Sequence, residues 1–208
     1  MKIILTSDTH SFHDKIHLPE GDMIIPAGDV SNKGTYGEAT SFLHWFKNLP
    51  LKHKVFIAGN HDFIFEKNPP LDSSNFPEGI TYLQNSAIEI EGVSIYGSPY
   101  TPEFYNWAFM KKRGEEMRQI WNMITNTVDI LITHGPPITI LDKSISGRLC
   151  GCEELLKRVT EIQPKVHVFG HIHEAYGMVE KSGTHFYNAS ILDESYRVKN
   201  KPFVIDVD

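Results

Sequence analysis

Five short apolar runs in this chain each lead into residue types that commonly bind metal ions. The runs lie at residues 3–7, 23–27, 55–58, 130–133 and 166–169. Their continuous hydrophobicity is typical of strands in a sheet that is covered on both faces. In open α/β sheets, ligands bind outside the carboxyl ends of such strands. We therefore expect the residues that follow the five runs to form one site.

The residues after the runs offer oxygen and nitrogen donors and no thiolate. The candidate metal ligands are Asp8, His10, Asp29, Asn60, His134, His171 and His173. This set is larger than one tetrahedral zinc site needs, and it suffices for two metal ions if one carboxylate bridges them. Such donors favour Mn, which is our first choice, or Fe, Ni, Co or Zn. A pair of divalent transition metal ions suits in-line displacement, most naturally at phosphorus.

Five motifs follow one another between residues 8 and 173. They are Asp8-x-His10, Gly28-Asp29, Gly59-Asn60-His61-Asp62, His134-Gly135 and Gly170-His171-x-His173. This ordered set resembles that of the calcineurin-like metallophosphoesterases. Four segments resemble more closely the metallophosphoesterase-domain-containing (MPPED-type) branch of small phosphodiesterases: 133–137, 151–156, 168–174 and 187–190. The resemblance implies an α/β fold, a two-sheet β-sandwich flanked by helices in a four-layer architecture.

The resemblance also implies a role for each motif residue. One metal would be held by Asp8, His10, Asp29 and His173, and the other by Asp29, Asn60, His134 and His171. Asp29 would bridge the two metals, and a hydroxide between them would attack phosphorus. His61 would be the general acid that protonates the leaving alkoxide. It needs an acidic partner that orients it, and Asp62 is the candidate, so we expect both residues to be catalytic.

Two positions differ from other branches of the superfamily. Protein serine/threonine phosphatases have Asp and Arg where this chain has Asn32 and Lys33, and purple acid phosphatases have a tyrosine ligand at the position of Asn32. Without the planar Arg fork, only the point charge of Lys33 is available to a phosphoryl group. That suits a singly charged diester better than a dianionic monoester. We therefore expect a phosphodiesterase that acts on small diesters such as cyclic nucleotides.

The aromatic residues between positions 100 and 109 are also candidates for substrate contact. They are Tyr100, Phe104, Tyr105, Trp107 and Phe109. Packing in the core is the more common role for such residues. The alternative is that Tyr100 or Trp107 stacks on a substrate base at the rim of the pocket. The histidines outside the motifs, among them His167, are expected to have no catalytic role.

The length of 208 residues is ordinary for a single α/β domain, which we expect to span residues 1–208. The net charge of −6 makes a nucleic-acid partner unexpected. The first apolar run reaches Asp8 too early for a secretory signal, and no run approaches the length of a membrane span. Cys150 and Cys152 are too close in sequence to pair without strain, so reduced thiols and a cytoplasmic location are expected. The sequence does not predict the oligomeric state.

Local patterns predict the remaining elements. Apolar residues at helical spacing predict helices over 37–48 and 113–125, and a third that contains Leu155, Val159 and Ile162 and stops before Pro164. The Pro- and Ser-rich stretch 64–79 predicts an irregular loop. Strands are expected at 86–90 and 93–97, joined by a turn at Glu91-Gly92, and at 176–180, 184–187 and 203–207.

Three other functions stay open. One is a scaffold or binding protein that keeps the fold but has lost catalysis, although every motif residue is retained. The others are a phosphomonoesterase and a nuclease of the same superfamily. The acidity of the chain and the lack of a basic stripe count against the nuclease.

Overall fold

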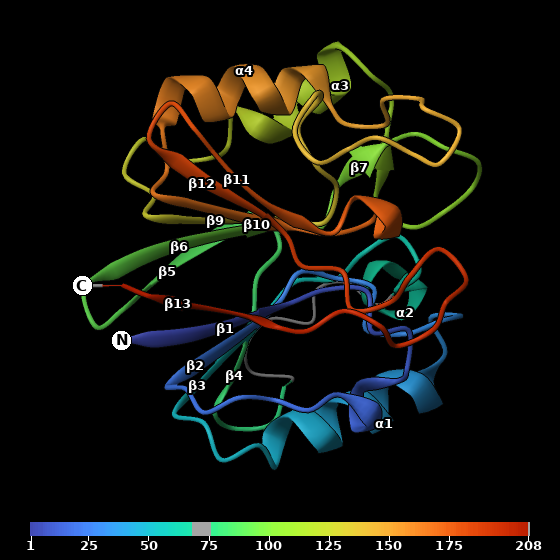
Figure 1. Ribbon diagram of the computed structural model, residues 1–208, viewed down its shortest axis with the longest axis vertical. Helices are drawn as coiled ribbons and strands as arrows, with labels where there is room; N and C mark the ends of the chain where they lie inside the picture. Colours follow the sequence, from blue (N-terminus) through green and yellow to red (C-terminus); the bar gives the residue numbers. More distant parts are fainter. Residues whose placement is uncertain (68–75, 208) are drawn as a thin grey trace.

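The computed structural model describes residues 1–67 and 76–207, and it places two β-sheets face to face between two layers of helices (Figure 1). The first sheet has the order β13-β1-β2-β3-β4. Its strands are β1 (Lys2–Thr6), β2 (Met23–Pro26), β3 (His53–Phe56), β4 (Ile80–Tyr82) and β13 (Phe203–Asp206). Strands β1 to β4 run parallel, and β13 pairs with β1 antiparallel.

The second sheet has the order β11-β12-β10-β9-β6-β5. Its strands are β5 (Ser86–Ile90), β6 (Val93–Ser98), β9 (Ile130–Thr133), β10 (Val166–Phe169), β11 (Gly177–Lys181) and β12 (Thr184–Asn188). The four inner strands run parallel, and the two edge strands β5 and β11 are antiparallel to their neighbours. A separate parallel pair is formed by β7 (Thr101–Pro102) and β8 (Met110–Lys111).

The helices cover the outer faces of the two sheets. They are α1 (Tyr36–Lys47), α2 (Phe63–Lys67), α3 (Glu115–Trp121) and α4 (Glu153–Ile162), with short 3-10 turns at His13–Lys15 and His173–Ala175. In Figure 1, α1 lies below the first sheet, and α3 and α4 lie above the second. This is the four-layer α/β sandwich that the sequence predicts.

Alternating side chains of each strand explain why the strands are apolar on both faces. On β1, Ile3 and Leu5 are fully buried in the core between the two sheets, together with Ile130 of β9. Ile4, between them in sequence, belongs instead to the cluster that contains Phe42 of α1. Because successive strand residues point to opposite faces, a strand that is buried on both sides is apolar at most of its positions.

The parallel strands bring their carboxyl ends to one end of the molecule. This end is on the right in Figure 1, opposite the N-terminus. An isolated parallel bridge between Ser7 and Ser190 joins the two sheets there. The loops are also tied by backbone hydrogen bonds, among them Asp8 N to Gly28 O at 3.0 Å. The residues after the strands of both sheets therefore meet at one place.

The predicted strands are confirmed, but the short strands β4, β7 and β8 are not predicted, and two helical regions differ from expectation. The second predicted helix is shorter than 113–125, because α3 ends at Trp121. The loop predicted at 64–79 is wrong at its start, where α2 occupies Phe63–Lys67, and residues 68–75 lie outside the described part. Helix α2 is stabilised by Phe65, which packs against Phe56 of β3 and Tyr82 of β4. No helix within residues 1–67 and 76–207 has the length and apolarity to cross a bilayer.

Candidate metal centre

The structure brings the candidate ligands together where the two sheets meet. Three overlapping groups have ligand atoms within 4.8 Å of one another: Asp8 with His10 and His173, Asp8 with Asp29 and His134, and His10 with Asp29 and His61. Asn60 joins them through its Oδ1, which lies 2.9 Å from His134 Nε2. The ring of His171 lies 5.1 Å from that of His134. All seven candidates are therefore at one site.

Asp29 lies between the two expected sets of ligands. Its Oδ2 is 3.6 Å from Nε2 of His10 and 3.3 Å from Nε2 of His134. Its Oδ1 accepts a hydrogen bond of 2.8 Å from the backbone N–H of His61. This is the position that a bridging carboxylate requires.

Backbone carbonyl groups orient two of the histidines. Nδ1 of His134 lies 3.0 Å from the carbonyl oxygen of Ala27, and Nδ1 of His173 lies 3.1 Å from that of Asp193. A carbonyl oxygen only accepts, so each Nδ1 carries the proton and donates it. Each Nε2 then faces the carboxylates, 3.4 Å from Asp8 Oδ1 in the case of His173. Histidines that bind metals are commonly oriented in this way.

The charges in the site form two coupled pairs. Burial acts to lower the pKa of His134, but the charge of Asp29 raises it to about 9. Burial likewise opposes the effect of Asp8 on His173, whose pKa is also raised to about 9. Burial would raise the pKa values of Asp8 and Asp29, but the histidines lower both well below the usual range. Both carboxylates are therefore ionised.

The remaining histidines have the properties of neutral ligands. Burial lowers the pKa values of His10 and His171 to about 4. Both ring nitrogens of His10 are buried and have no hydrogen-bond partner among the described residues. Unpartnered buried polar atoms are costly and uncommon. A nitrogen of this kind beside two carboxylates fits a divalent metal ion.

The backbone of the site is held in an uncommon conformation. Asp8, His10, Asp29 and His171 all have positive φ, at 52°, 39°, 51° and 69°. Residues other than glycine adopt this conformation at an energetic cost, and such residues cluster at functional sites. The conformation turns each side chain into the site directly after its strand.

The glycines of two motifs leave room for the carboxylates. A Cβ atom at Gly170 would overlap Oδ2 of Asp8, and one at Gly59 would overlap Oδ1 of Asp29. The absence of a side chain at these positions lets each carboxylate lie directly against the backbone. At the first position, the N–H of His171 donates to Asp8 Oδ2 at 2.9 Å.

His61 is oriented by a backbone carbonyl and by aromatic rings. Its Nδ1 lies 2.7 Å from the carbonyl oxygen of Asn32, and Trp107 stacks on its ring with centroids 4.3 Å apart. The ring of His10 meets it edge-on at 4.6 Å. His61 therefore lies beside the ligand cluster with one nitrogen already bonded.

Asp62 has a different position from the one that we expect from the sequence. Its buried carboxylate accepts hydrogen bonds from the backbone N–H groups of Val30, Ser31 and Gly59. Burial and the nearby charge of Asp29 raise its pKa to about 6. Asp62 therefore connects two loops of the site through hydrogen bonds to their backbone. The oxygen that orients His61 is instead the carbonyl oxygen of Asn32.

The two residues that we expect to contact substrate lie further out. Lys33 is exposed, and its side chain has no ion pair among the described residues. Its backbone N–H donates to Glu38, which also closes the capping box of α1 with Thr35. The ring of Tyr100 is edge-on to Phe109 at 5.7 Å. Among these aromatic residues, the one that reaches His61 is Trp107.

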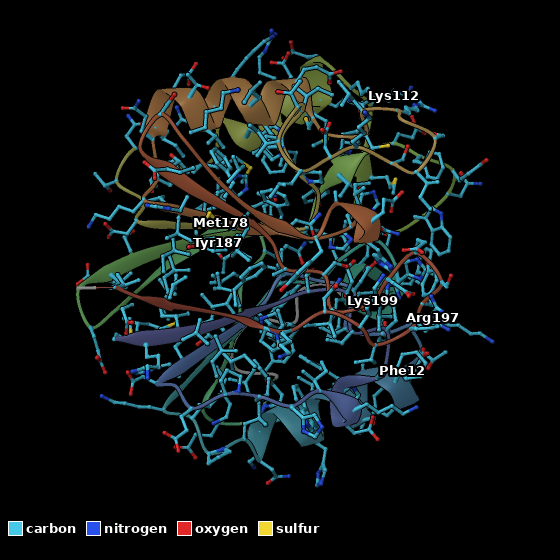
Figure 2. The ribbon with its side chains drawn as sticks, viewed as in Figure 1. Phe12, Lys112, Met178, Tyr187, Arg197 and Lys199 are labelled. Atoms are coloured by element: carbon cyan, nitrogen blue, oxygen red, sulfur yellow. The ribbon has the colours of Figure 1, made fainter. Side chains whose placement is uncertain are left out.

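Sequence reasoning missed Tyr196 as a neighbour of the ligands. Its ring lies 4.9 Å from that of His10 and 5.1 Å from that of His173. The turn that carries it is closed by Asp193, which accepts hydrogen bonds from the backbone N–H and the guanidinium of Arg197. Arg197 is at the right-hand end of the molecule in Figure 2, where the strand-end loops gather. The turn carries no recognisable motif, and it enters the site only through the fold.

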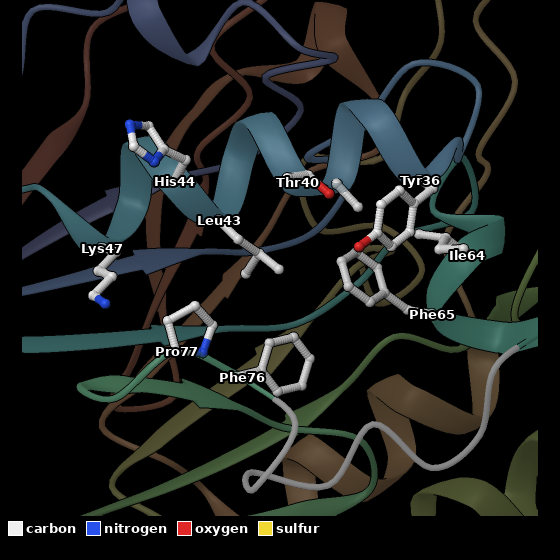
Figure 3. Close-up of a pocket in the computed structure, with 10 residues that line it drawn as sticks. Tyr36, Thr40, Leu43, His44, Lys47, Ile64, Phe65, Phe76 and Pro77 are labelled. Carbon is white, nitrogen blue, oxygen red and sulfur yellow. The ribbon is translucent and has the colours of Figure 1, made fainter.

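A separate pocket of about 570 Å³ lies between α1 and α2 (Figure 3). Its walls include Tyr36, Leu43, Phe65, Phe76 and Pro77. None of the candidate ligands lines it. It is distinct from the metal centre.

Comparisons with known proteins agree with the architecture and the motifs. A family described as "Calcineurin-like phosphoesterase" matches residues 1–175. The chain is 40% identical to Metallophosphoesterase domain-containing protein 1 of Homo sapiens, over 99% of this chain and 71% of that protein. It is 34% identical to UPF0046 protein K07C11.7 of Caenorhabditis elegans, over 98% of this chain and 74% of that protein.

Two solved structures share the fold at low identity. Phosphopantetheinyl Hydrolase (PptH) from Mycobacterium tuberculosis has a TM-score of 0.61 at 15% identity, covering 94% of this chain and 90% of that one. TT1561 of Thermus thermophilus has a TM-score of 0.59 at 11% identity, covering 90% and 88%. These likenesses concern the fold alone.

Proposed function

This chain belongs to the calcineurin-like phosphoesterase family, and on that basis we propose that it is a dinuclear metal-dependent phosphodiesterase of small diesters such as cyclic nucleotides. The family and the Asp/His cluster support a metal-dependent phosphoester hydrolase. The observation that carries the proposal is the position of Asp29 between His10 and His134. One carboxylate between two sets of donors is the arrangement that two metal ions need.

For the division of ligands between two metal ions, we propose the one that the family resemblance implies. One metal ion would be held by Asp8, His10, Asp29 and His173, and the other by Asp29, Asn60, His134 and His171. Bound divalent ions would supply an activated water as nucleophile and would neutralise charge on the phosphoryl oxygens. Mn is our first choice among the metals that these donors suit.

His61 is the residue that would donate a proton to the leaving oxygen. Its Nδ1 is bonded to the carbonyl oxygen of Asn32, which fixes the ring and leaves Nε2 free for the leaving group. Trp107 stacks on one face of the ring and holds it in this orientation. Asp62 supports this role indirectly, because it holds Gly59 and Ser31 on either side of the site.

The preference for diesters is supported by the chemistry around position 33. Lys33 is exposed and carries a point charge. It lacks the planar pair of N–H donors with which an arginine would bind the second negative charge of a phosphomonoester. We propose Lys33 and, more weakly, Tyr100 as substrate contacts. The net charge of −6 disfavours long polyanions. The free cysteines Cys150 and Cys152 support a reducing compartment, for which we propose the cytoplasm.

A substrate panel tests the proposal. Purified protein is loaded with Mn, Ni, Zn or Fe and assayed with bis(p-nitrophenyl) phosphate, a cyclic nucleotide and p-nitrophenyl phosphate. We expect a higher kcat/KM for the diesters with the same metal, and no hydrolysis after chelation. The Lys33→Arg variant should narrow the gap between the diester and the monoester. Preference for the monoester with every metal would instead identify a phosphatase.

A further inference from the structure

A second pocket, of about 310 Å³, adjoins the metal centre at His171. Its lining includes Arg113, Ser144, Ser146, Arg148 and Cys150. Pro102, Phe104 and Ile172 supply apolar surface, and Glu103 is the acidic residue among those that line it. We refer to it as the Arg148 pocket. A substrate held by the metals beside His171 has this pocket next to it.

Arg113 is fixed in the wall of the Arg148 pocket. Its Nη1 donates to the carbonyl oxygen of Gly151 at 2.8 Å and to Glu153 at 2.7 Å, and its Nη2 donates to the carbonyl oxygen of Cys150 at 3.1 Å. These bonds use three of its five N–H donors, so two remain. Glu153 balances its charge. Arg113 is therefore a rigid donor whose position is set before any ligand arrives.

The loop that carries Arg148 is tied to the metal centre. The turn is closed by a hydrogen bond from Gly147 N to Ser144 O at 2.8 Å, and the backbone N–H of Ile145 donates to Glu174 at 2.7 Å. Glu174 follows His173 directly, in the same 3-10 turn. The wall of the pocket and a candidate metal ligand are thus held by one short segment.

The side chain of Arg148 is uncommitted. Its guanidinium makes no hydrogen bond or ion pair with any residue in the described ranges, although its backbone carbonyl accepts from Ser144. The carboxylate of Glu103 likewise has no hydrogen bond or ion pair in the part of the chain that the structure describes. The pocket therefore presents one uncommitted guanidinium, two spare donors of Arg113 and one opposing carboxylate. The hydroxyls of Ser144 and Ser146 are bonded to each other, and Ser144 Oγ also donates to the carbonyl oxygen of Arg148. Guanidinium groups in this setting bind oxyanions, often in bidentate form.

We propose that the Arg148 pocket binds a second phosphoryl group of the substrate, one that is not hydrolysed. The proposal rests on the phosphoesterase function, and it narrows the substrate class to phosphodiesters that carry an additional phosphate. Arg148 and the free donors of Arg113 hold the additional phosphate. The negative charge of Glu103 repels the phosphate and weakens its binding, so the product is released more easily.

A matched pair of substrates tests the pocket. The p-nitrophenyl ester of thymidine 5′-phosphate is compared with the same ester that carries a 3′-phosphate, and the measured quantity is the ratio of their kcat/KM values. The wild type should prefer the 3′-phosphorylated ester. Arg148→Gln should reduce this ratio on the order of 10- to 100-fold, the usual effect of losing a hydrogen bond to a charged group. Arg148→Lys should reduce it less, and Glu103→Gln should increase it.

Arg118→Gln is the control for a general loss of positive charge. Arg118 lies on α3 and pairs with Glu115 outside the pocket, so the ratio should stay at the wild-type value. Thermal unfolding confirms that each variant is folded. A wild type without preference, or an Arg148→Gln ratio within twofold of the wild type, would overturn the proposal.

Binding measurements separate this proposal from the proposed function. Isothermal titration compares thymidine 3′,5′-bisphosphate with thymidine 5′-monophosphate on metal-loaded wild type and Arg148→Gln. Tighter binding of the bisphosphate that depends on Arg148 supports the pocket even if no ester is hydrolysed, in which case the phosphodiesterase function alone fails. Equal binding of the two nucleotides rejects the pocket whatever the enzyme hydrolyses.

Discussion

The indole of Trp107 stacks on the imidazole of His61, with ring centroids 4.3 Å apart and planes inclined by 27°. The stack and the hydrogen bond to Asn32 O fix the ring from two directions. Trp107→Ala should therefore lower kcat for diesters with poor leaving groups by about 10- to 100-fold, because a misplaced catalytic group costs about this much. Trp107→Phe should recover most of the rate, and metal content should stay unchanged. Tyr105→Ala is the control, because Tyr105 is exposed and lines neither the metal centre nor the Arg148 pocket. A Trp107→Ala variant with wild-type kcat would remove Trp107 from the mechanism.

The rate loss that follows removal of the general acid should depend on the leaving group of the substrate. His61→Ala should slow hydrolysis of an alkyl diester by about 10²- to 10⁴-fold, the usual contribution of general acid catalysis. The deficit should be much smaller for bis(p-nitrophenyl) phosphate, since nitrophenolate leaves without a proton. The check is a plot of log kcat/KM against the pKa of the leaving alcohol for both proteins. Parallel lines would mean that His61 does not act as the acid.

Gly170 offers a test of how tightly the carboxylate of Asp8 is packed. A methyl group there would overlap Oδ2 of Asp8, so Gly170→Ala should displace the carboxylate and lower metal affinity. Equilibrium dialysis with Mn measures the change. Gly37→Ala is the control, because a Cβ on this glycine of α1 meets no atom within 4 Å. That variant should bind metal as the wild type does and gain about 0.5–1 kcal/mol in helix stability. Unchanged affinity in Gly170→Ala would contradict the close packing.

His167 predicts a dependence of stability on pH. The hydroxyl of Thr133 donates to Gly135 O, so Nε2 of His167 donates to that hydroxyl, and Nδ1 is left buried without a partner among the described residues. Burial lowers the pKa of His167 to about 3 in the folded protein, from 6.5. Between these two pKa values, His167 is protonated in the unfolded chain but neutral in the folded protein. Its protonation therefore leaves the free energy of unfolding unchanged above pH 6.5 and lowers it progressively as the pH falls toward 3.

The measurement is urea unfolding of the chelated protein between about pH 7 and pH 4, a range chosen to span the titration of one histidine. His167→Leu should reduce the slope of the unfolding free energy against pH by about 1.4 kcal/mol per pH unit, the value for one proton. An identical slope in the variant and the wild type would show that His167 does not titrate in this way.

The sequence predicts the strands and the ligand cluster because both arise from local patterns. Continuous apolar runs indicate strands that are buried on both faces. The residues that directly follow parallel strands lie at the same end of the molecule. Helix α2 could not be predicted in this way, because Phe65 is held by aromatic rings of β3 and β4 that the fold supplies. Tyr196 reaches His10 through a distant turn. Such contacts are set by tertiary structure and leave no local pattern.

The contacts of the Asp62 side chain could not be predicted from its place in the sequence. Its position beside His61 in the chain suggests that it orients that ring. The backbone turns between them, and the carboxylate faces the N–H groups of Val30, Ser31 and Gly59 instead. Adjacency in sequence does not place two side chains in contact.

Metal content per chain, measured by elemental analysis after reconstitution with Mn, tests the dinuclear centre most directly. Asp29 lies between His10 and His134 and would serve both ions. We predict two equivalents in the wild type and fewer than one in Asp29→Asn. One equivalent or none in the folded wild type, or full occupancy in Asp29→Asn, would contradict a centre bridged by Asp29.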